Sequence, residues 1–150
     1  MARTLSSQIE IAATPAEVWA VLADLPGYAD WNPFVVEAAG NVVVGERLRV
    51  RIQPVGGRAM TFKPRVTAAE PARELAWLGS AGVRGLFDGA HRFELRPSAT
   101  GTLLLQSEEF TGVLVPLVWR SMAAGSQAGF EQMNLALKRR VEARARAPRA

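Results

Sequence analysis

The feature that most constrains the fold is a long amphipathic segment in the last third of the chain. Between residues 115 and 146, apolar and small side chains recur at steps of three and four, which is the spacing of one helical face. They are Val118, Met122, Gly125, Gly129, Phe130, Met133, Leu137 and Val141. A helix of about 28 residues spans roughly 42 Å. We therefore expect this helix to lie along a large apolar surface provided by the rest of the chain.

The segments before this helix have the pattern of short strands. Over residues 47–53, Leu48, Val50 and Ile52 alternate with arginines, so that one face is apolar and the other is charged. This alternation is typical of antiparallel sheets with one buried face. We expect an α+β fold whose strands cover residues 5–12, 34–38, 47–53, 60–68, 74–79, 86–96 and 102–111. Pro64 interrupts one of them, which indicates an edge or a bulge.

Two short helices are predicted between the first and second strands. Thr14, Pro15 and Glu17 have the spacing of a capping box with proline at the first helical position. A second helical turn is expected over 28–31, ending at Asn32-Pro33. A curved sheet wrapped around the long C-terminal helix would account for the order of these elements. The length of 150 residues suits one domain with a substantial core.

Composition narrows the classes of function. Hydrophobic content of 49% and charged content of 21% are ordinary for a soluble globular protein. The N-terminus lacks the apolar core of a signal peptide, and no run of apolar residues is long enough to cross a membrane, so a cytoplasmic location without a membrane segment is expected. One histidine and no cysteine argue against a zinc site. No phosphate-binding glycine motif is present, and we expect neither metal nor cofactor.

The net charge of +4 is concentrated at the C-terminal end. Residues 138–150 hold six basic groups and one acid, whereas the preceding residues hold 12 basic and 13 acidic groups. The sequence shows no basic face with interleaved aromatic residues, so a nucleic-acid partner is not expected. We interpret the basic segment as a solvated helix end, where cations suit the helix dipole.

Several segments resemble one known superfamily. They are IEIAATPAEVWAVLAD (9–24), YADWNPF (28–34), HRFELRP (91–97), GTLLLQSEEFTG (101–112) and GFEQMNLALK (129–138). Together they resemble the START-like, birch-pollen-allergen-like (SRPBCC) superfamily, in particular its bacterial polyketide cyclase/dehydrase-like branch. The resemblance implies a helix-grip fold, in which a seven-stranded antiparallel sheet grips the C-terminal helix around an apolar cavity. Members include lipid and sterol carriers, hormone receptors, aromatase/cyclases, quinone-binding proteins and chaperone activators, so the fold does not fix the function.

The inward faces of the predicted sheet and helix supply candidate ligand-binding residues. Ligand pockets are mostly apolar with a few polar groups, although each such side chain could equally fill a core. The candidates are Trp31, Phe34, Phe62, Trp77, His91, Phe93, Gln106, Phe110, Trp119, Met122, Phe130 and Met133.

His91 is the candidate for acid–base chemistry, with Glu108 as its partner. Alternation places His91 on the apolar face of its strand, where it is either a functional acid–base group or a structural histidine. Both faces of the last strand begin with apolar residues, so periodicity leaves its orientation open. The family pattern favours Gln106 and Glu108 pointing inward, toward His91.

Three functions remain open at this point. The leading one is non-catalytic binding of a small hydrophobic molecule: a lipid, a sterol-like compound, a quinone or an aromatic polyketide. The second is a polyketide cyclase or dehydratase that uses His91 with Glu108. The third is a chaperone-like or quinone-binding interaction module that uses the basic tail or the glycine-rich segment 79–85. A homodimer is also left open.

Overall fold

The computed structural model describes residues 2–148, which form an α+β structure. In chain order the elements are β1 (Arg3–Ile11), α1 (Pro15–Leu22), the 3-10 turn η1 (Leu25–Gly27), α2 (Tyr28–Trp31), β2 (Val35–Ala39), β3 (Arg49–Ile52), β4 (Met60–Phe62), β5 (Arg65–Glu70), β6 (Glu74–Ser80), β7 (Asp88–Ser98), β8 (Gly101–Thr111) and α3 (Val115–Arg146). The predicted long C-terminal helix is confirmed over the whole of 115–146.

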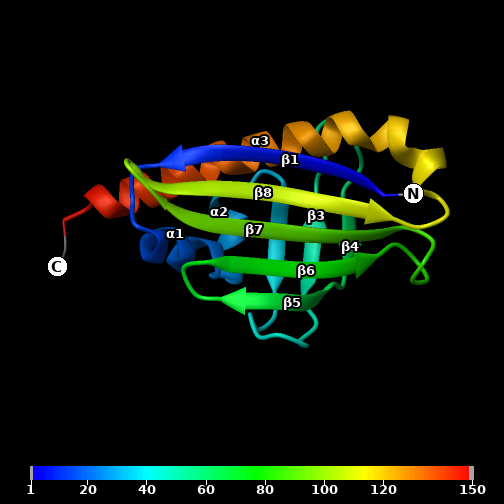
Figure 1. Cartoon of the computed structure of the whole chain (residues 1–150), viewed down its shortest axis with the longest axis horizontal. Coiled ribbons are helices and arrows are strands. Elements are labelled where there is room, and N and C mark those ends of the chain that lie inside the picture. Colours follow the sequence, from blue (N-terminus) through cyan, green and yellow to red (C-terminus); the bar gives the residue numbers. More distant parts are fainter. Residues whose placement is uncertain (1, 149–150) are drawn as a thin grey trace.

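The strands form two antiparallel sheets. Five strands lie in the order β1-β8-β7-β6-β5, and three lie in the order β2-β3-β4. Figure 1 shows the five long strands side by side, with β3 and β4 crossing behind them and α3 running along the β1 edge. The helix packs mainly on β1 and more weakly on β8. The two sheets and the helix therefore surround a common interior, as a helix-grip fold requires.

The prediction of a single seven-stranded sheet is wrong, because the strand expected over 60–68 is two strands in two sheets. Pro64 has no N–H to donate and a fixed φ, so it interrupts the ladder and the chain bends. As a result β4 pairs with β3, whereas β5 pairs with β6. Residues 45–48 still connect the sheets: the Leu48 amide donates to the Pro64 carbonyl at 2.7 Å, and the Val66 amide donates to the Glu46 carbonyl at 2.9 Å.

The two short helices close one end of the interior. The capping box is formed, since the Glu17 amide donates to Thr14 Oγ1 at 3.2 Å and the Thr14 amide donates to Glu17 Oε2 at 2.9 Å. Tyr28 of α2 is fully buried, and its hydroxyl donates to the Leu22 carbonyl at 2.5 Å. Burial, with a smaller contribution from the Asp24 carboxylate, raises the pKa of Tyr28 far above its ordinary value. This tyrosine is thus a neutral structural group.

The C-terminal part of α3 is fastened to the start of the chain. Glu142 accepts hydrogen bonds from the Ala12 amide at 2.8 Å and from Lys138 Nζ at 2.5 Å. The Ala12 N–H and the Lys138 ammonium hold the pKa of Glu142 below its usual range. Lys138 Nζ also donates to the Glu10 carbonyl at 2.9 Å. The segment that we interpreted as solvated therefore includes a docking contact, while Arg139 lies exposed. Residues 149–150 of the predicted tail lie outside the described residues.

Candidate functional site

A cavity of about 340 Å³ lies between the two sheets and the N-terminal half of α3. Its walls come from β3, β4, β6, β7, β8 and α3, and most of the lining side chains are aromatic or aliphatic. The volume falls at the lower end of the range for small-molecule sites. The cavity is therefore large enough for a compact organic molecule.

Part of the predicted ligand-binding set lines this cavity. The lining members are Phe34, Phe62, Trp77, His91, Phe110 and Met122, together with Glu108. They come from five strands or strand ends and from one face of α3. The alternation of the strands and the helical spacing of α3 bring these distant positions to one space.

The other predicted residues do not line the cavity. Four of them are buried in the packed core with no exposed surface: Phe93, Gln106, Phe130 and Met133. Trp31 packs edge-to-face against Tyr28, with ring centroids 5.1 Å apart. Trp119 packs against Phe110. The guanidinium carbon of Arg3 lies over the Trp119 ring, 5.6 Å from the ring centroid. Strand alternation and helical spacing predict which face of each element is apolar. They do not predict where along that face the interior is open.

Gly129 marks the place where the open part of the interior ends. A Cβ at this position would overlap the Phe34 ring, so only glycine lets the ring lie directly on the helix backbone. Phe34 then meets Phe130 edge-to-face with ring centroids 5.4 Å apart. This contact closes the space between β2 and α3. Beyond it the helix is packed against the sheets rather than separated from them.

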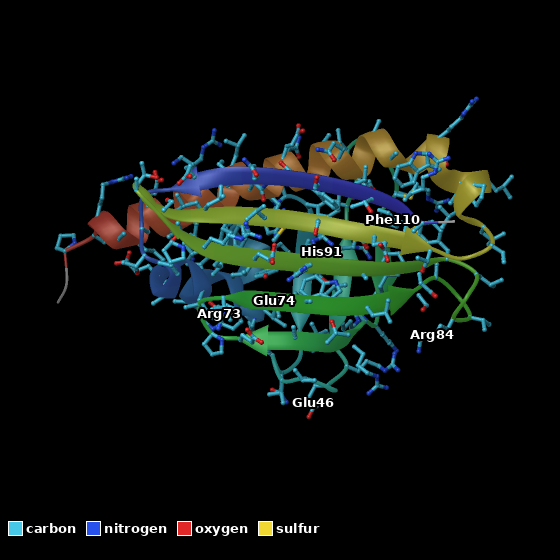
Figure 2. All side chains as sticks on the ribbon, in the orientation of Figure 1. Glu46, Arg73, Glu74, Arg84, His91 and Phe110 are labelled. Carbon is cyan, nitrogen blue, oxygen red and sulfur yellow. The ribbon has the colours of Figure 1, made fainter. Side chains whose placement is uncertain are left out.

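His91 and Glu108 face one another on neighbouring strands. They are directly opposite in the register of β7 and β8, and His91 Nδ1 lies 3.2 Å from Glu108 Oε1. Figure 2 shows His91 near the middle of the five-stranded sheet and Phe110 farther along toward the start of α3. His91 is only 3% exposed, whereas the Glu108 side chain is 19% exposed. The pair is thus a polar contact at the wall of an apolar cavity.

Gln106 fixes the tautomer of His91. Its Nε2 donates to Asn134 Oδ1 at 2.7 Å and to the Phe130 carbonyl, which can only accept, at 3.4 Å. The amide oxygen of Gln106 therefore points to His91 Nε2, 2.9 Å away, and this nitrogen must carry a hydrogen. A hydrogen bond between Nδ1 and Oε1 then requires one more proton, either on Nδ1, facing a carboxylate, or on Glu108, facing a bare nitrogen.

Glu108, rather than His91, presents free hydrogen-bonding atoms to the cavity. Both nitrogens of His91 are engaged, and its ring is stacked on Trp77 with centroids 5.4 Å apart and planes 25° apart. Oε1 of Glu108 contacts His91 Nδ1. Oε2 of Glu108 lies over Gly89, where the Cβ of any other residue would overlap it. An acid–base role for His91, with Glu108 as its partner, stays a prediction, and in this geometry neither nitrogen of His91 is free to contact a ligand directly. His91 holds Glu108, and Glu108 faces the cavity.

Several lining residues were not among the predicted set. Val50, Ile52 and Val118 lie on the apolar faces that the periodicity predicts. They are aliphatic, whereas the predicted candidates are mainly aromatic. Others come from turns or from the ends of strands and helices, where the periodic pattern is weak: Pro54, Pro64, Gly79, Ser80, Ala81 and Leu114. Met60 and Phe87 continue the predicted inward faces of their strands. Ser126 lies one turn beyond Met122 on α3.

Among residues 2–148, no three histidine, aspartate or glutamate side chains converge in a way that could hold a metal ion. Within the same described range, no helix is both long enough and apolar enough to cross a bilayer.

Comparison with known proteins places this geometry in a family. The model of a family described as polyketide cyclase/dehydrase and lipid transport matches residues 2–142. A comparison with curated protein sequences found no match.

Among solved structures, the Zhui aromatase/cyclase from Streptomyces sp. R1128 is 23% identical, with a TM-score of 0.79 and 98% of each chain covered. A protein of Mesorhizobium loti is 23% identical, with a TM-score of 0.72, covering 97% of this chain and 100% of that one. A protein of Thermus thermophilus is 16% identical, with a TM-score of 0.75 and coverage of 97% and 100%. At these identities the likeness establishes the fold alone. The family match, which extends over most of the sequence, shows that this chain belongs to the polyketide cyclase/dehydrase and lipid transport family.

Proposed function

We propose that this protein binds a small, mainly apolar molecule that carries one hydroxyl or phenol group, and that Glu108 contacts this group. The observation that carries the proposal is the apolar cavity of about 340 Å³ in which His91 and Glu108 are the titratable side chains among the lining residues. Burial of apolar ligand surface would supply most of the affinity. Fused-ring aromatic compounds of the polyketide type, quinols and small sterol-like alcohols have this chemistry.

A hydroxyl group suits Glu108 in either protonation state. When the shared proton is on His91, the Glu108 carboxylate accepts a hydrogen bond from the ligand. When the proton is on Glu108, the carboxyl group can donate to the ligand oxygen instead. A charged carboxylate on the ligand would instead meet the Glu108 carboxylate inside an apolar space, where like charges are costly. The cavity wall is therefore matched to a neutral polar group.

The test compares two probes of similar shape, 2-naphthol and 2-methylnaphthalene, by titration calorimetry. We expect 2-naphthol to bind about tenfold more tightly, as one hydrogen bond to a charged group allows. Glu108→Gln should remove most of this difference. Glu109→Gln is the matched control, because Glu109 is the next residue on β8 and is exposed on the other face. If neither probe binds, and native mass spectrometry of the purified protein shows no hydrophobic adduct, the proposal is wrong.

A cyclase or dehydratase is the second candidate, and the contact between His91 and Glu108 at the wall of the cavity favours it. A carboxylate next to His91 in an apolar cavity can take a proton from a carbon beside a carbonyl, and the protonated carboxyl can return it. In this scheme Glu108 contacts the substrate. His91 is a positioning residue that stabilises each state of Glu108 through Nδ1. Its Nε2 stays bonded to Gln106 throughout.

Deuterium exchange next to the carbonyl of 2-tetralone tests this second candidate, followed by NMR in D₂O. Acid–base catalysis is typically worth about 10²- to 10⁴-fold, so we expect a clear acceleration that Glu108→Gln abolishes. His91→Asn should lower the exchange rate and change its pH profile while leaving 2-tetralone affinity within a few-fold. Glu109→Gln should change neither quantity. If the protein binds 2-tetralone but its deuterium exchange is no faster than in buffer, the enzyme hypothesis is wrong and the binding function alone remains.

A further inference from the structure

A second depression lies on the outside of the molecule, beside the break between β4 and β5 and the end of β6. Four basic side chains line it: Arg47, Lys63, Arg65 and Arg84. The first three come from the junction between the sheets, and Arg84 comes from the β6–β7 connection, where Figure 2 labels it. This basic groove contrasts with the predominantly apolar cavity that lies behind it.

Two arginines of the basic groove lie in positions where their like charges repel. Arg47 and Arg65 are bridge partners and thus lie directly opposite each other, a position in which like charges destabilise a sheet. Both guanidinium groups are held in place by backbone carbonyls. Arg47 Nη1 donates to the Lys63 carbonyl at 2.8 Å, and Arg65 Nη1 donates to the Gly45 carbonyl at 2.6 Å. The remaining guanidinium nitrogens stay free to bind another group.

No carboxylate neutralises these cations in the described part of the chain. Each ion pair found there involves other residues, as when Arg92 pairs with Glu74 and Glu94 on the neighbouring sheet surface. Glu46, although adjacent to Arg47 in sequence, makes none of these pairs. An anion bound in the basic groove would offset the repulsion between Arg47 and Arg65.

The basic groove and the cavity share part of their lining. Phe62 and Ser80 line both of them, and they are the last residues of β4 and of β6, beside the break at Pro64. The break in the sheet therefore places the apolar interior and the cluster of cations on the two sides of one wall, which includes Phe62 and Ser80. A molecule with an apolar body in the cavity could extend one end between Phe62 and Ser80 into the basic groove.

We infer that the basic groove is a binding site for an anionic end group, a phosphate or a carboxylate, of the molecule that occupies the cavity. Arginine forks match both groups through paired hydrogen bonds, and lysine adds a point charge. The inference rests on the proposed function and extends it. Inside the cavity, Glu108 selects a neutral hydroxyl, whereas the negatively charged end lies outside, among Arg47, Lys63, Arg65 and Arg84.

The test measures binding of decanol, decanoate, decyl phosphate and inorganic phosphate to the full chain by calorimetry at low salt. We expect both anionic amphiphiles to bind about tenfold or more tightly than decanol, with inorganic phosphate much weaker than decyl phosphate. The double variant Lys63→Gln/Arg65→Gln should bring all three amphiphiles to similar affinity. Arg84→Gln, in a connection rather than a strand, should lower the preference in part. Arg139→Gln/Arg140→Gln, with two exposed cations on α3, is the control of equal charge change.

The outcomes separate this inference from the proposed function. Decanol binding as tightly as the anions would overturn the anion site and leave the cavity function standing. The same holds if the control variant loses the preference as fully as Lys63→Gln/Arg65→Gln. Inorganic phosphate binding as tightly as decyl phosphate would also overturn the inference, since the basic groove would then take a free anion. Failure of every amphiphile, decanol included, would overturn the anion site, whereas the 2-naphthol titration decides the proposed function separately.

Discussion

The two halves of α3 lie against the same sheets but make opposite kinds of contact. In the first half, Val118, Met122 and Ser126 face the cavity. In the second half, Phe130, Met133 and Leu137 have no exposed surface and fill the interior. The stripe of side chains is continuous, yet its residues change from small or flexible to large at Gly129. One helix therefore contributes packed core at one end and a wall of the cavity at the other.

The largest expected effect comes from truncating a side chain in the packed half. Leu137→Ala removes a fully buried side chain and should lower the free energy of unfolding by about 3 kcal/mol, as such core truncations do. Met122 lies in the other half of the helix and borders the cavity. Met122→Ala should therefore lower the free energy of unfolding by about 1 kcal/mol or less. Urea unfolding of both variants measures the difference. Equal losses would mean that the cavity half is packed in solution and that the comparison does not hold.

A smaller effect is expected at the anchored end of the packed half. The pKa of Glu142 is held below its ordinary value of 4.5, first by the Ala12 N–H and then by Lys138. Because the folded-state pKa is the lower one, Glu142 stabilises the fold at pH values above the unfolded pKa, and this contribution is lost as the pH falls through the folded pKa. Glu142→Gln should therefore cost about 1 kcal/mol at pH 7 and almost nothing once Glu142 is protonated in both states.

Unfolding at pH 7, and again at a pH low enough to protonate Glu142 in the folded state as well, checks this sign. Glu131→Gln is the control, because Glu131 is exposed on the same helix. A cost of Glu142→Gln that is the same at both pH values would show that the loss comes from packing and not from the charge.

The sequence predicted most of this architecture because its strongest signals are local. The period of α3, the capping box at Thr14 and the alternation of β7 and β8 each depend on neighbouring residues. The division of the strand at Pro64 was less predictable. A proline can mark an edge, a bulge or a break, and which one occurs depends on the strands that pair on either side of it.

The membership of the candidate site was predictable only in part, and the roles of its residues less so. Strand alternation predicts that His91 points inward, and the family pattern predicts the same for Glu108. In the structure, His91 Nδ1 lies 3.2 Å from Glu108 Oε1. Which of the two faces the open space depends on Gln106 and Gly89, whose contacts come from other strands and from α3. The extent of the cavity depends on side-chain volumes meeting across the interior, such as Phe34 on Gly129. No periodic pattern within one segment contains that information.

The smallest expected change in stability, and the sharpest test of the comparison, comes from filling the cavity. Val118→Phe adds a ring on the cavity side of α3, where open space rather than packed atoms lies beside it. Overpacking a tight core costs typically 1–3 kcal/mol, whereas here the added apolar surface is buried in a void. We therefore expect the free energy of unfolding to change by less than about 0.5 kcal/mol while 2-naphthol binding is lost. The matched substitution Val141→Phe, in the fully buried part of the packed half, should instead destabilise the fold and leave the cavity unchanged. If Val118→Phe keeps full affinity, the ligand lies elsewhere; if it unfolds the protein as Val141→Phe does, both halves of α3 are equally packed.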